Sequence, residues 1–355
     1  MTLEVVKRGL YKAVPSLFAL VIGLFAGGIL MKAYGYHPLL AYKWLFWGAF
    51  ATVSRFAETL AYAIPLMLTG LTFGICMRAG LFNIGAEGQA YMGAIGAVIG
   101  GALISLPHPI HIVVATLMAM LFGMLWSVVP AWLKAWRGVH EVISTIMFNW
   151  IAYYGAMYLA SNVLYDPNSP ERTLVVHPSA RYSVICHDSS LTSVLFVAIA
   201  FNVIIYLYIN LTKSGYELRV YGSNPDASKY AGVSEKKVIM QSFLIGGLAA
   251  GLAGGSQIFG RPPTWALYGN LGNVLNIGFD GIGVALVGRN DPIGIIIASI
   301  FFGALRGGGR YMEAYAGVCS ELVSAINGLI VIALSVPEII ELIRRWRIRR
   351  RVRIE

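Results

Sequence analysis

The chain has 355 residues, of which 57% are hydrophobic and 12% are charged, and its mean hydropathy is +0.68. A soluble domain carries about 25% charged residues, so this composition excludes a soluble fold. The apolar runs are long and unbroken, whereas the strands of a membrane β-barrel alternate apolar and polar residues. The sequence therefore predicts an all-α polytopic membrane protein.

The formal net charge of +10 does not indicate nucleic-acid binding, because most of the excess lies in 344–353, directly after the last apolar run. Positive charge in that place is typical of a cytoplasmic anchor at an anionic lipid surface. Cys76, Cys186 and Cys319 lie far apart and lack metal-ligand spacing. The sequence contains neither a P-loop nor a nucleophile motif, so we expect no enzyme activity, metal or cofactor in this chain.

About ten apolar segments are predicted to span the membrane, with both chain ends cytoplasmic. In chain order they are 13–31, 58–77, 81–104, 111–131, 142–162, 191–211, 238–259, 271–288, 293–306 and 318–337. The aromatic segment 40–57 is expected in the outer interface and the loop 163–190 outside the cell, whereas the basic loops 132–141 and 212–238 are expected inside. Eight full spans with two re-entrant segments are the alternative.

A six-residue pattern occurs twice, as N-I-G-A-E-G in Asn83–Gly88 and as N-I-G-F-D-G in Asn276–Gly281. A carboxylate inside a membrane span costs about 2.5–3.5 kcal/mol. Two such carboxylates in the same local frame indicate a duplicated unit with a break in a helix at its centre, and paired breaks point to a transport site. The copies predict inverted repeats over about 58–162 and 238–337.

The sequence accordingly divides into an N-terminal span with its interfacial segment (1–57), a core (58–337) and a basic cytoplasmic tail (338–355). Small residues recur at four-residue spacing in the core, as in Gly247, Gly251 and Gly255, and predict closely packed helices.

Asn83 and Glu87 are four residues apart, so we expect them on one face of a helix, and Asn276 and Asp280 repeat that spacing. One interpretation is a polar translocation path. The other is that each carboxylate caps a broken helix or accepts from an unwound backbone N–H. Polar and aromatic residues of the motifs and of the span 142–162 are the candidate path residues: Phe82, Asn83, Glu87, Gln89, Asn149, Asn276, Phe279 and Asp280.

The segment H-E-V-I-S-T-I-M-F-N opens the span at 142–162. Glu141 near the start of that helix suits the helix dipole. Ser144, Thr145 and Asn149 either line a path or hydrogen-bond to neighbouring helices.

The internal loop contains a predicted short helix. Asn224 is its expected cap, Pro225 its first residue, 227–231 its body and Gly232 its end. A short helix among basic residues on the cytoplasmic side is a candidate docking element for a soluble partner.

Three segments, G-L-F-N-I-G-A-E-G-Q, H-E-V-I-S-T-I-M-F-N and Y-G-S-N-P-D-A-S-K-Y-A-G-V, resemble the permease subunits of ABC-type importers of the branched-chain amino acid, ribose and nucleoside group. The E-G-Q form and the length are most similar to the larger permease of nucleoside importers. The resemblance covers the chain from about residue 58 and implies a multi-pass protein of the bacterial cell membrane, surrounded by membrane lipids.

The resemblance also implies partners: a second, shorter permease, a substrate-binding lipoprotein outside, and a cytoplasmic ABC ATPase that binds ATP and Mg. The ATPase is expected to dock on a coupling helix near 224–232. The residues expected to couple to it are Gly222, Asn224, Pro225, Ala227, Ala231 and Gly232.

Two classes of function compete at this point. In the first, the chain is the permease of an ATP-driven importer, for which nucleosides are the leading cargo, simple sugars such as ribose follow and amino acids come last. In the second, it is an ion-coupled secondary transporter, in which Glu87 and Asp280 would suit proton or Na⁺ coupling. A docking helix favours the first class, because a carrier that acts alone has no use for one.

Overall fold

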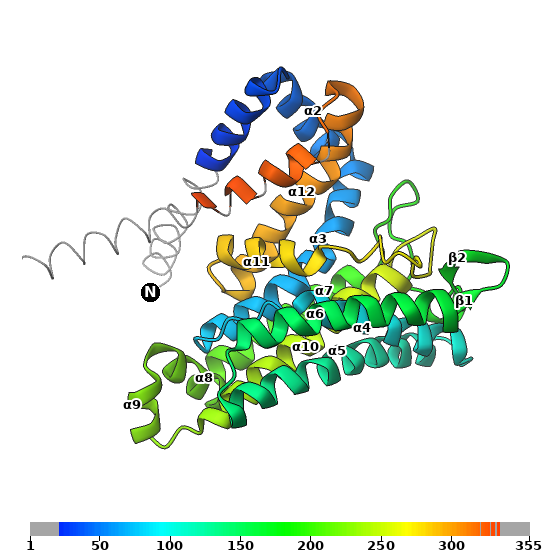
Figure 1. Ribbon diagram of the computed structural model, residues 1–355. Helices are drawn as coiled ribbons and strands as arrows, with labels where there is room; N and C mark the ends of the chain where they lie inside the picture. Colours follow the sequence, from blue (N-terminus) through cyan, green and yellow to red (C-terminus); the bar gives the residue numbers. More distant parts are fainter. Residues whose placement is uncertain (1–20, 320, 327, 331, 334–355) are drawn as a thin grey trace, which may run out of the picture. The chain divides into compact units, whose positions relative to one another are not determined.

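The computed structural model describes residues 21–319, 321–326, 328–330 and 332–333. The predicted basic tail, the beginning of the span 13–31 and most of the end of the span 318–337 lie outside these residues. The chain forms two compact units, one made of 1–48 and 305–355 and the other of 49–304. Helices dominate both, and the ribbon can be followed by colour in Figure 1.

The helices follow the apolar segments of the sequence. A first helix covers Val21–Ala33. Among those that follow are α2 (Pro38–Phe50), α3 (Val53–Arg78), α4 (Ala86–Val98), α5 (Ile110–Arg137), α6 (Glu141–Tyr158), α7 (Val194–Leu211), α8 (Lys213–Ser223), α9 (Pro225–Tyr230), α10 (Glu235–Phe259), α11 (Ile277–Val287) and α12 (Pro292–Ala316). Single π-helical turns extend α4 over Ile99–Leu103 and α6 over Leu159–Val163.

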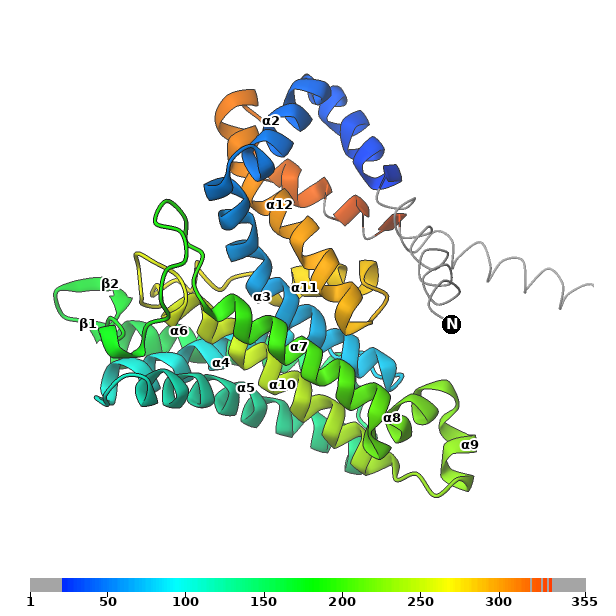
Figure 2. The ribbon, with the colours of Figure 1, turned by 180° about the vertical axis from the view of Figure 1, so that it is seen from behind.

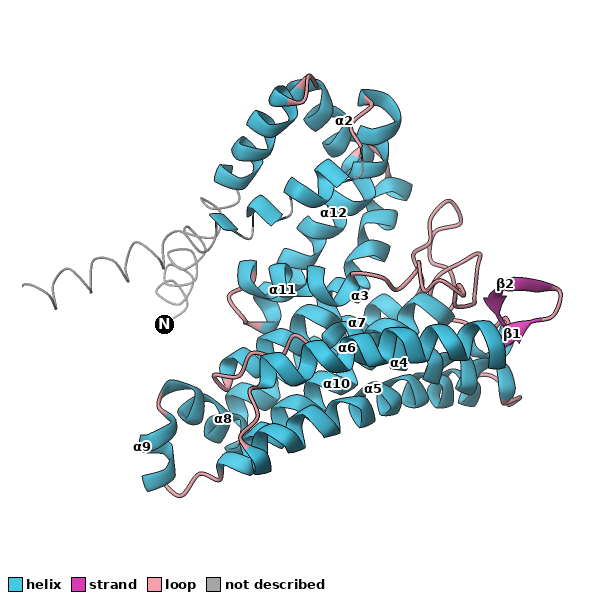
Figure 3. Cartoon of the chain, viewed as in Figure 1, coloured by secondary structure: helices cyan, strands magenta, loops and turns pink. Residues whose placement is uncertain are grey.

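Within the described ranges, five helices are long and apolar enough to cross a membrane: α3, α5, α7, α10 and α12. The prediction of an all-α polytopic membrane protein is thereby confirmed at this level. The loop 163–190 adds a feature that the sequence did not predict, a small antiparallel hairpin of β1 (Tyr165–Asp166) and β2 (Ser169–Thr173), drawn in magenta in Figure 3.

Small residues bring the helices of the larger unit into backbone contact. α10 packs against α3, α4 and α5. A Cβ atom added to Gly123 of α5 would lie 2.5 Å from the Cα atom of Gly251, and one added to Gly93 of α4 would overlap the same residue. A methyl group cannot fit at these crossings, and the predicted role of the glycine row on α10 is confirmed.

The smaller unit contains α2 and the end of α12. The rings of Trp44 and Tyr315 stack with centroids 4.5 Å apart, and Gly48 lies against Tyr311. The segment 40–57, predicted as one interfacial stretch, is in fact divided: α2 ends at Phe50, and the hydroxyl of Thr52 accepts from the N–H of Arg55 to begin α3. The reason is the N-terminal cap that this threonine provides.

Within the larger unit, the hairpin and the pair α8–α9 lie at opposite ends of the helix bundle, as the two views in Figures 1 and 2 both show. The loop expected outside the cell and the loop expected inside are therefore separated by the length of the bundle.

Candidate functional site

The first motif begins with a break between α3 and α4. The N–H of Leu81 donates to the carbonyl of Cys76 over 2.9 Å, and the N–H of Gly80 donates to the carbonyl of Met77 over 3.0 Å. These two bonds form a Schellman motif, which needs a left-handed residue; Gly80 has φ +69°. The chain then runs without helix to Gly85, the N-cap of α4. The predicted break is confirmed.

Asn83 lies in this non-helical stretch, so the prediction that Asn83 and Glu87 share one helical face is wrong. The carboxamide oxygen of Asn83 accepts from the N–H of Gly85 over 2.8 Å. That local bond competes with helix formation and keeps α4 from starting earlier. Asn83 is fully buried.

Asn149 of α6 joins the two sides of the break. Its side-chain oxygen accepts from the N–H of Gly88 over 2.9 Å, and its side-chain nitrogen donates to the carbonyl of Ile84 over 3.0 Å. The first bond satisfies an N–H of the first turn of α4, which has no partner within that helix. The side chain of Asn149 is therefore engaged in holding the broken helix.

Glu87 connects the first motif to the second. One carboxylate oxygen accepts from the N–H of Asn276 and from the hydroxyl of Tyr91, both over 2.5 Å. The other accepts from the N–H groups of Gly278, over 2.6 Å, and Phe279, over 3.4 Å. These N–H groups belong to the N-terminus of α11, where a negative charge is favourable. Glu87 thus caps a helix whose N-cap residue, Asn276, lies 189 residues later in the chain.

The second motif is shaped to receive this carboxylate. Asn276 takes a left-handed conformation with φ 64°, and its side chain makes no capping bond to α11. A Cβ atom on Gly278 would overlap the backbone of Glu87, so only glycine fits there. The start of α11 is also held by α3, because the hydroxyl of Thr69 donates to the carbonyl of Ile277 over 2.8 Å.

Exposure separates the candidate path residues into two groups. Phe82 and Phe279 expose 37% and 46% of their surface. Asn276 is also exposed, and Asp280, in the first turn of α11, is half-buried. The remaining four are buried within the chain: Asn83, Glu87, Gln89 and Asn149. Only the first group offers side-chain surface to a molecule outside this chain.

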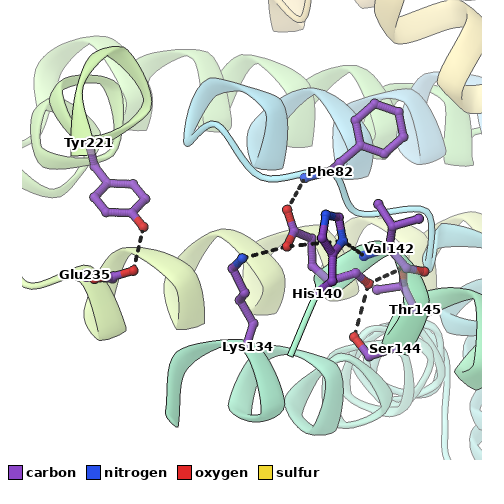
Figure 4. Close-up of polar contacts among 9 residues, drawn as sticks. Phe82, Lys134, His140, Val142, Ser144, Thr145, Tyr221 and Glu235 are labelled. Carbon is purple, nitrogen blue, oxygen red and sulfur yellow. Dashed lines mark hydrogen bonds and ion pairs between the residues drawn. The ribbon is translucent and has the colours of Figure 1, made fainter. Parts of the chain in front are cut away.

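An ion pair holds the backbone beside Phe82 (Figure 4). Glu141 begins α6, and its carboxylate contacts Lys134 of α5 over 2.8 Å while accepting from the N–H of Phe82 over 3.4 Å. Its backbone carbonyl accepts from the hydroxyls of Ser144 and Thr145. These two hydroxyls therefore donate within α6 itself, not to a neighbouring helix.

The predicted short helix in the loop 212–238 is confirmed as α9. The side chain of Asn224 accepts from the N–H of Ala227 over 3.0 Å, and Pro225 is the first helical residue. Ala231 is the C-cap, and Gly232 follows with φ +77°.

The stretch before this short helix, for which no element was predicted, is the helix α8, which Thr212 caps by accepting from the N–H of Gly215. Tyr221 of α8 donates to Glu235 of α10 over 2.9 Å (Figure 4). Burial and then this hydrogen bond raise the pKa of Tyr221, so its hydroxyl remains a donor.

Several residues of the site were not predicted. Tyr91, four residues after Glu87, shares its helical face, so the spacing alone indicates this pair. No local signal identifies the contacts of Thr69 with α11 or of Arg78 with Asp291, because each joins distant parts of the chain. Lys134 and Glu141 are only seven residues apart, but they lie on α5 and α6, and their contact depends on the turn between these helices. Within the described part of the chain, no group of three or more His, Cys, Asp or Glu residues is placed to hold a metal ion.

Comparison with known proteins identifies the family. Residues 55–337 match a family described as branched-chain amino acid transport system / permease component. The chain is 39% identical over 332 residues to the guanosine ABC transporter permease protein NupP of Bacillus subtilis (strain 168), covering 92% of this chain and 94% of that protein. It is 34% identical over 341 residues to the nucleoside ABC transporter permease protein NupB of Lactococcus lactis subsp. cremoris (strain MG1363), covering 93% and 92%. The glucose ABC transporter permease protein TsgB13 of Haloferax volcanii is 31% identical over 333 residues, covering 89% and 85%.

The same two bacteria each contain a second, more distant relative, the permease proteins NupQ, 27% identical over 263 residues, and NupC, 25% identical over 263 residues. No solved structure matches the chain. The family match covers most of the sequence, and the identity to NupP extends over nearly the whole of both proteins. The chain therefore belongs to the family of ABC transporter permeases described as the permease component of branched-chain amino acid transport systems.

Proposed function

We propose that this chain is the membrane-spanning permease of an ATP-driven importer and that it lines the path by which nucleosides enter the cell. The observation that carries this proposal is the similarity to NupP and NupB, which are named for guanosine and for nucleosides, at 39% and 34% identity. A simple sugar is the second candidate cargo, favoured by the glucose in the name of TsgB13.

The exposed path residues support a neutral aromatic cargo. The ring of Phe82 meets that of Phe73 edge-on, with centroids 4.9 Å apart and planes at 89°. This contact fixes the orientation of Phe82 while leaving part of it exposed. A nucleoside base stacks on such rings and hydrogen-bonds to a nearby amide without needing a counter-charge. We assign Phe82, Asn276 and Phe279 to the path, and Asn83, Glu87, Gln89 and Asn149 to its scaffold.

The position of Glu87 bears on the ion-coupled alternative. Both oxygens of its carboxylate accept backbone N–H groups of α11, so the residue is already committed to a structural contact. A proton- or Na⁺-coupling carboxylate must exchange its partner during each cycle. This commitment favours the ATP-driven class.

We propose about ten spans, both chain ends in the cytoplasm and two inverted repeats, with 58–337 as the permease core. The family match over 55–337 supports that core. The break before α4 and the motif that begins α11 support the repeats. The location of the hairpin and of α8–α9 at opposite ends of the bundle supports the assignment of their loops to opposite sides of the membrane.

The surface of α8 and α9 supports ATPase docking. The two helices form a cavity of about 330 Å³ lined by Tyr216, Arg219, Val220, Ser223, Asn224 and Ala227. Tyr216 is 60% exposed and Tyr230 is 96% exposed. Exposed tyrosines beside a cavity are typical of protein interfaces. We propose that the ATPase, which binds ATP and Mg, docks here.

The pairs NupP with NupQ and NupB with NupC, each from one bacterium, indicate a second permease as partner. An external substrate-binding lipoprotein completes the proposed importer.

Transport by the complete complex tests the proposal. The two permeases and the ATPase are reconstituted in liposomes with the binding protein, and uptake of labelled guanosine, uridine, ribose, glucose and leucine is compared with and without ATP. We expect ATP-dependent uptake of the nucleosides. Uptake of ribose or glucose with exclusion of both nucleosides would overturn the assignment of cargo, and uptake by the lone chain would overturn the ATP-driven class.

A further inference from the structure

The end of α3 is in backbone contact with α8. A Cβ atom on Gly222 would overlap the carbonyl oxygen of Arg78 and lie 3.0 Å from the carbonyl carbon of Ala79. A Cβ atom on Gly80 would lie 3.4 Å from the Cα atom of Gly222. Because no side chain separates these two backbones, a displacement of α8 cannot be absorbed by a change of rotamer and must move the end of α3.

The side chain of Arg78 contacts the turn between α11 and α12. Its Nε donates to the carbonyl of Asn290 over 2.9 Å, and its guanidinium contacts the carboxylate of Asp291 over 2.9 Å. The side chains of Arg78 and Asp291 are 27% and 35% exposed, respectively. Arginine is suited to such a contact, because its planar guanidinium presents several donors in a fixed arrangement.

The turn that Arg78 holds is attached to both flanking helices. The N–H of Asn290 donates to the carbonyl of Ala285 in α11 over 2.7 Å. The carboxylate of Asp291 accepts from the N–H of Ile293 in α12 over 3.2 Å. A displacement of this turn therefore reaches α11, a helix about 16 Å long at 1.5 Å per residue, whose other end carries Phe279.

We propose that Arg78 is the positioning residue that carries a movement of α8 into the second broken helix, α11. The first broken helix receives the same movement along the backbone from Ala79 to Phe82, which the ion pair of Lys134 and Glu141 steadies. Through these two routes, a movement at one contact on α8 reaches both motifs that contain the exposed path residues. This inference rests on the proposed function, since it takes the loop of α8 and α9 as the docking surface of the ATPase.

Site-specific labelling tests whether the movement of α8 reaches Phe82 and Phe279 by separate contacts. Cys186 and Cys319 are replaced by serine, Cys76 stays because it is fully buried, and a single cysteine is placed by Phe82→Cys or Phe279→Cys. The complete complex is treated with a maleimide in the absence of nucleotide and with ATP and vanadate. In a complex that carries no further substitution, we expect the labelling rates at positions 82 and 279 each to differ at least threefold between the nucleotide-free state and the state with ATP and vanadate.

In Arg78→Gln we expect the response at position 279 to fall below 1.5-fold, while the response at position 82 stays within twofold of its parental value. Lys134→Gln is the matched control. It should reduce the nucleotide-dependent change in labelling at position 82 and leave the change at position 279 unaltered. Arg78→Lys, which keeps the charge but places its donors on a single nitrogen instead of a planar fork, should restore part of the response at position 279.

Three outcomes would overturn the inference: an unchanged response at position 279 in Arg78→Gln, an equal loss at both positions, or no nucleotide response at position 279 in the parental complex. The readout needs no cargo. A parental complex that responds to ATP at both positions yet takes up no nucleoside would contradict the proposed cargo and leave the role of Arg78 intact.

Discussion

Gly278 donates its backbone N–H to the carboxylate of Glu87 over 2.6 Å, although the two residues are 191 positions apart in the chain. Each belongs to one copy of the repeated motif. The acidic residue of the first copy caps the helix that the second copy begins, so the two breaks form one structure. A charged side chain inside a membrane protein is tolerable where backbone N–H groups surround it.

Replacing Glu87 by glutamine should lower the thermal unfolding midpoint of the purified chain. The loss of a helix cap costs about 0.5–2 kcal/mol, and the amide nitrogen would add a donor where the carboxylate accepts four bonds. Asp280→Asn is the control, because it removes a charge from the same helix terminus without touching the cap. Equal shifts in the two variants would contradict the capping role.

Asn149→Ala should destabilise the break before α4. The substitution leaves the N–H of Gly88 and the carbonyl of Ile84 buried without their partner, at a cost of about 1–3 kcal/mol. Asn162→Ala makes the same chemical change at an exposed site, where the side chain donates to the carbonyl of Tyr158, and should have little effect. Urea or thermal unfolding in detergent compares the two. If Asn149→Ala is as stable as the parental chain but slow in uptake, Asn149 belongs to the path instead.

Two substitutions at Asn276 separate its conformation from its side chain. Glycine adopts the left-handed conformation freely, whereas alanine is strained there. If the amide contacts the cargo, Asn276→Gly and Asn276→Ala should both reduce uptake severalfold while nucleoside binding by the external protein is unchanged. Parental uptake by Asn276→Gly with slow uptake by Asn276→Ala would show that only the backbone conformation matters.

Ala227→Arg should weaken binding of the ATPase at least tenfold in a pull-down or in biolayer interferometry. Ala227 is exposed in the first turn of α9 and lines the cavity beside it, so a long charged side chain would fill the space proposed for the partner. Asn168→Arg places the same side chain on the hairpin at the opposite end of the bundle and should bind normally. The docking assignment fails if the two variants bind the ATPase equally well.

The sequence by itself determined the class of fold, the break in the first motif, the short helix after Asn224 and the tight crossings along α10. Each of these follows from local chemistry: the length of an apolar run, a glycine that can take a left-handed conformation, an asparagine followed by proline, or small residues one turn apart. The family also followed from short motifs, because they are contiguous in the chain.

The tertiary structure alone decided what the carboxylate and amides of these motifs do. Spacing placed Asn83 beside Glu87 on one helix, but the bond from Gly85 to Asn83 keeps that residue outside α4. Nothing near Glu87 in the sequence indicates that its partners are the N–H groups of α11. The physical reason is that the N–H groups of a helix terminus can be satisfied by any acceptor that the fold brings within reach, whatever its distance along the chain.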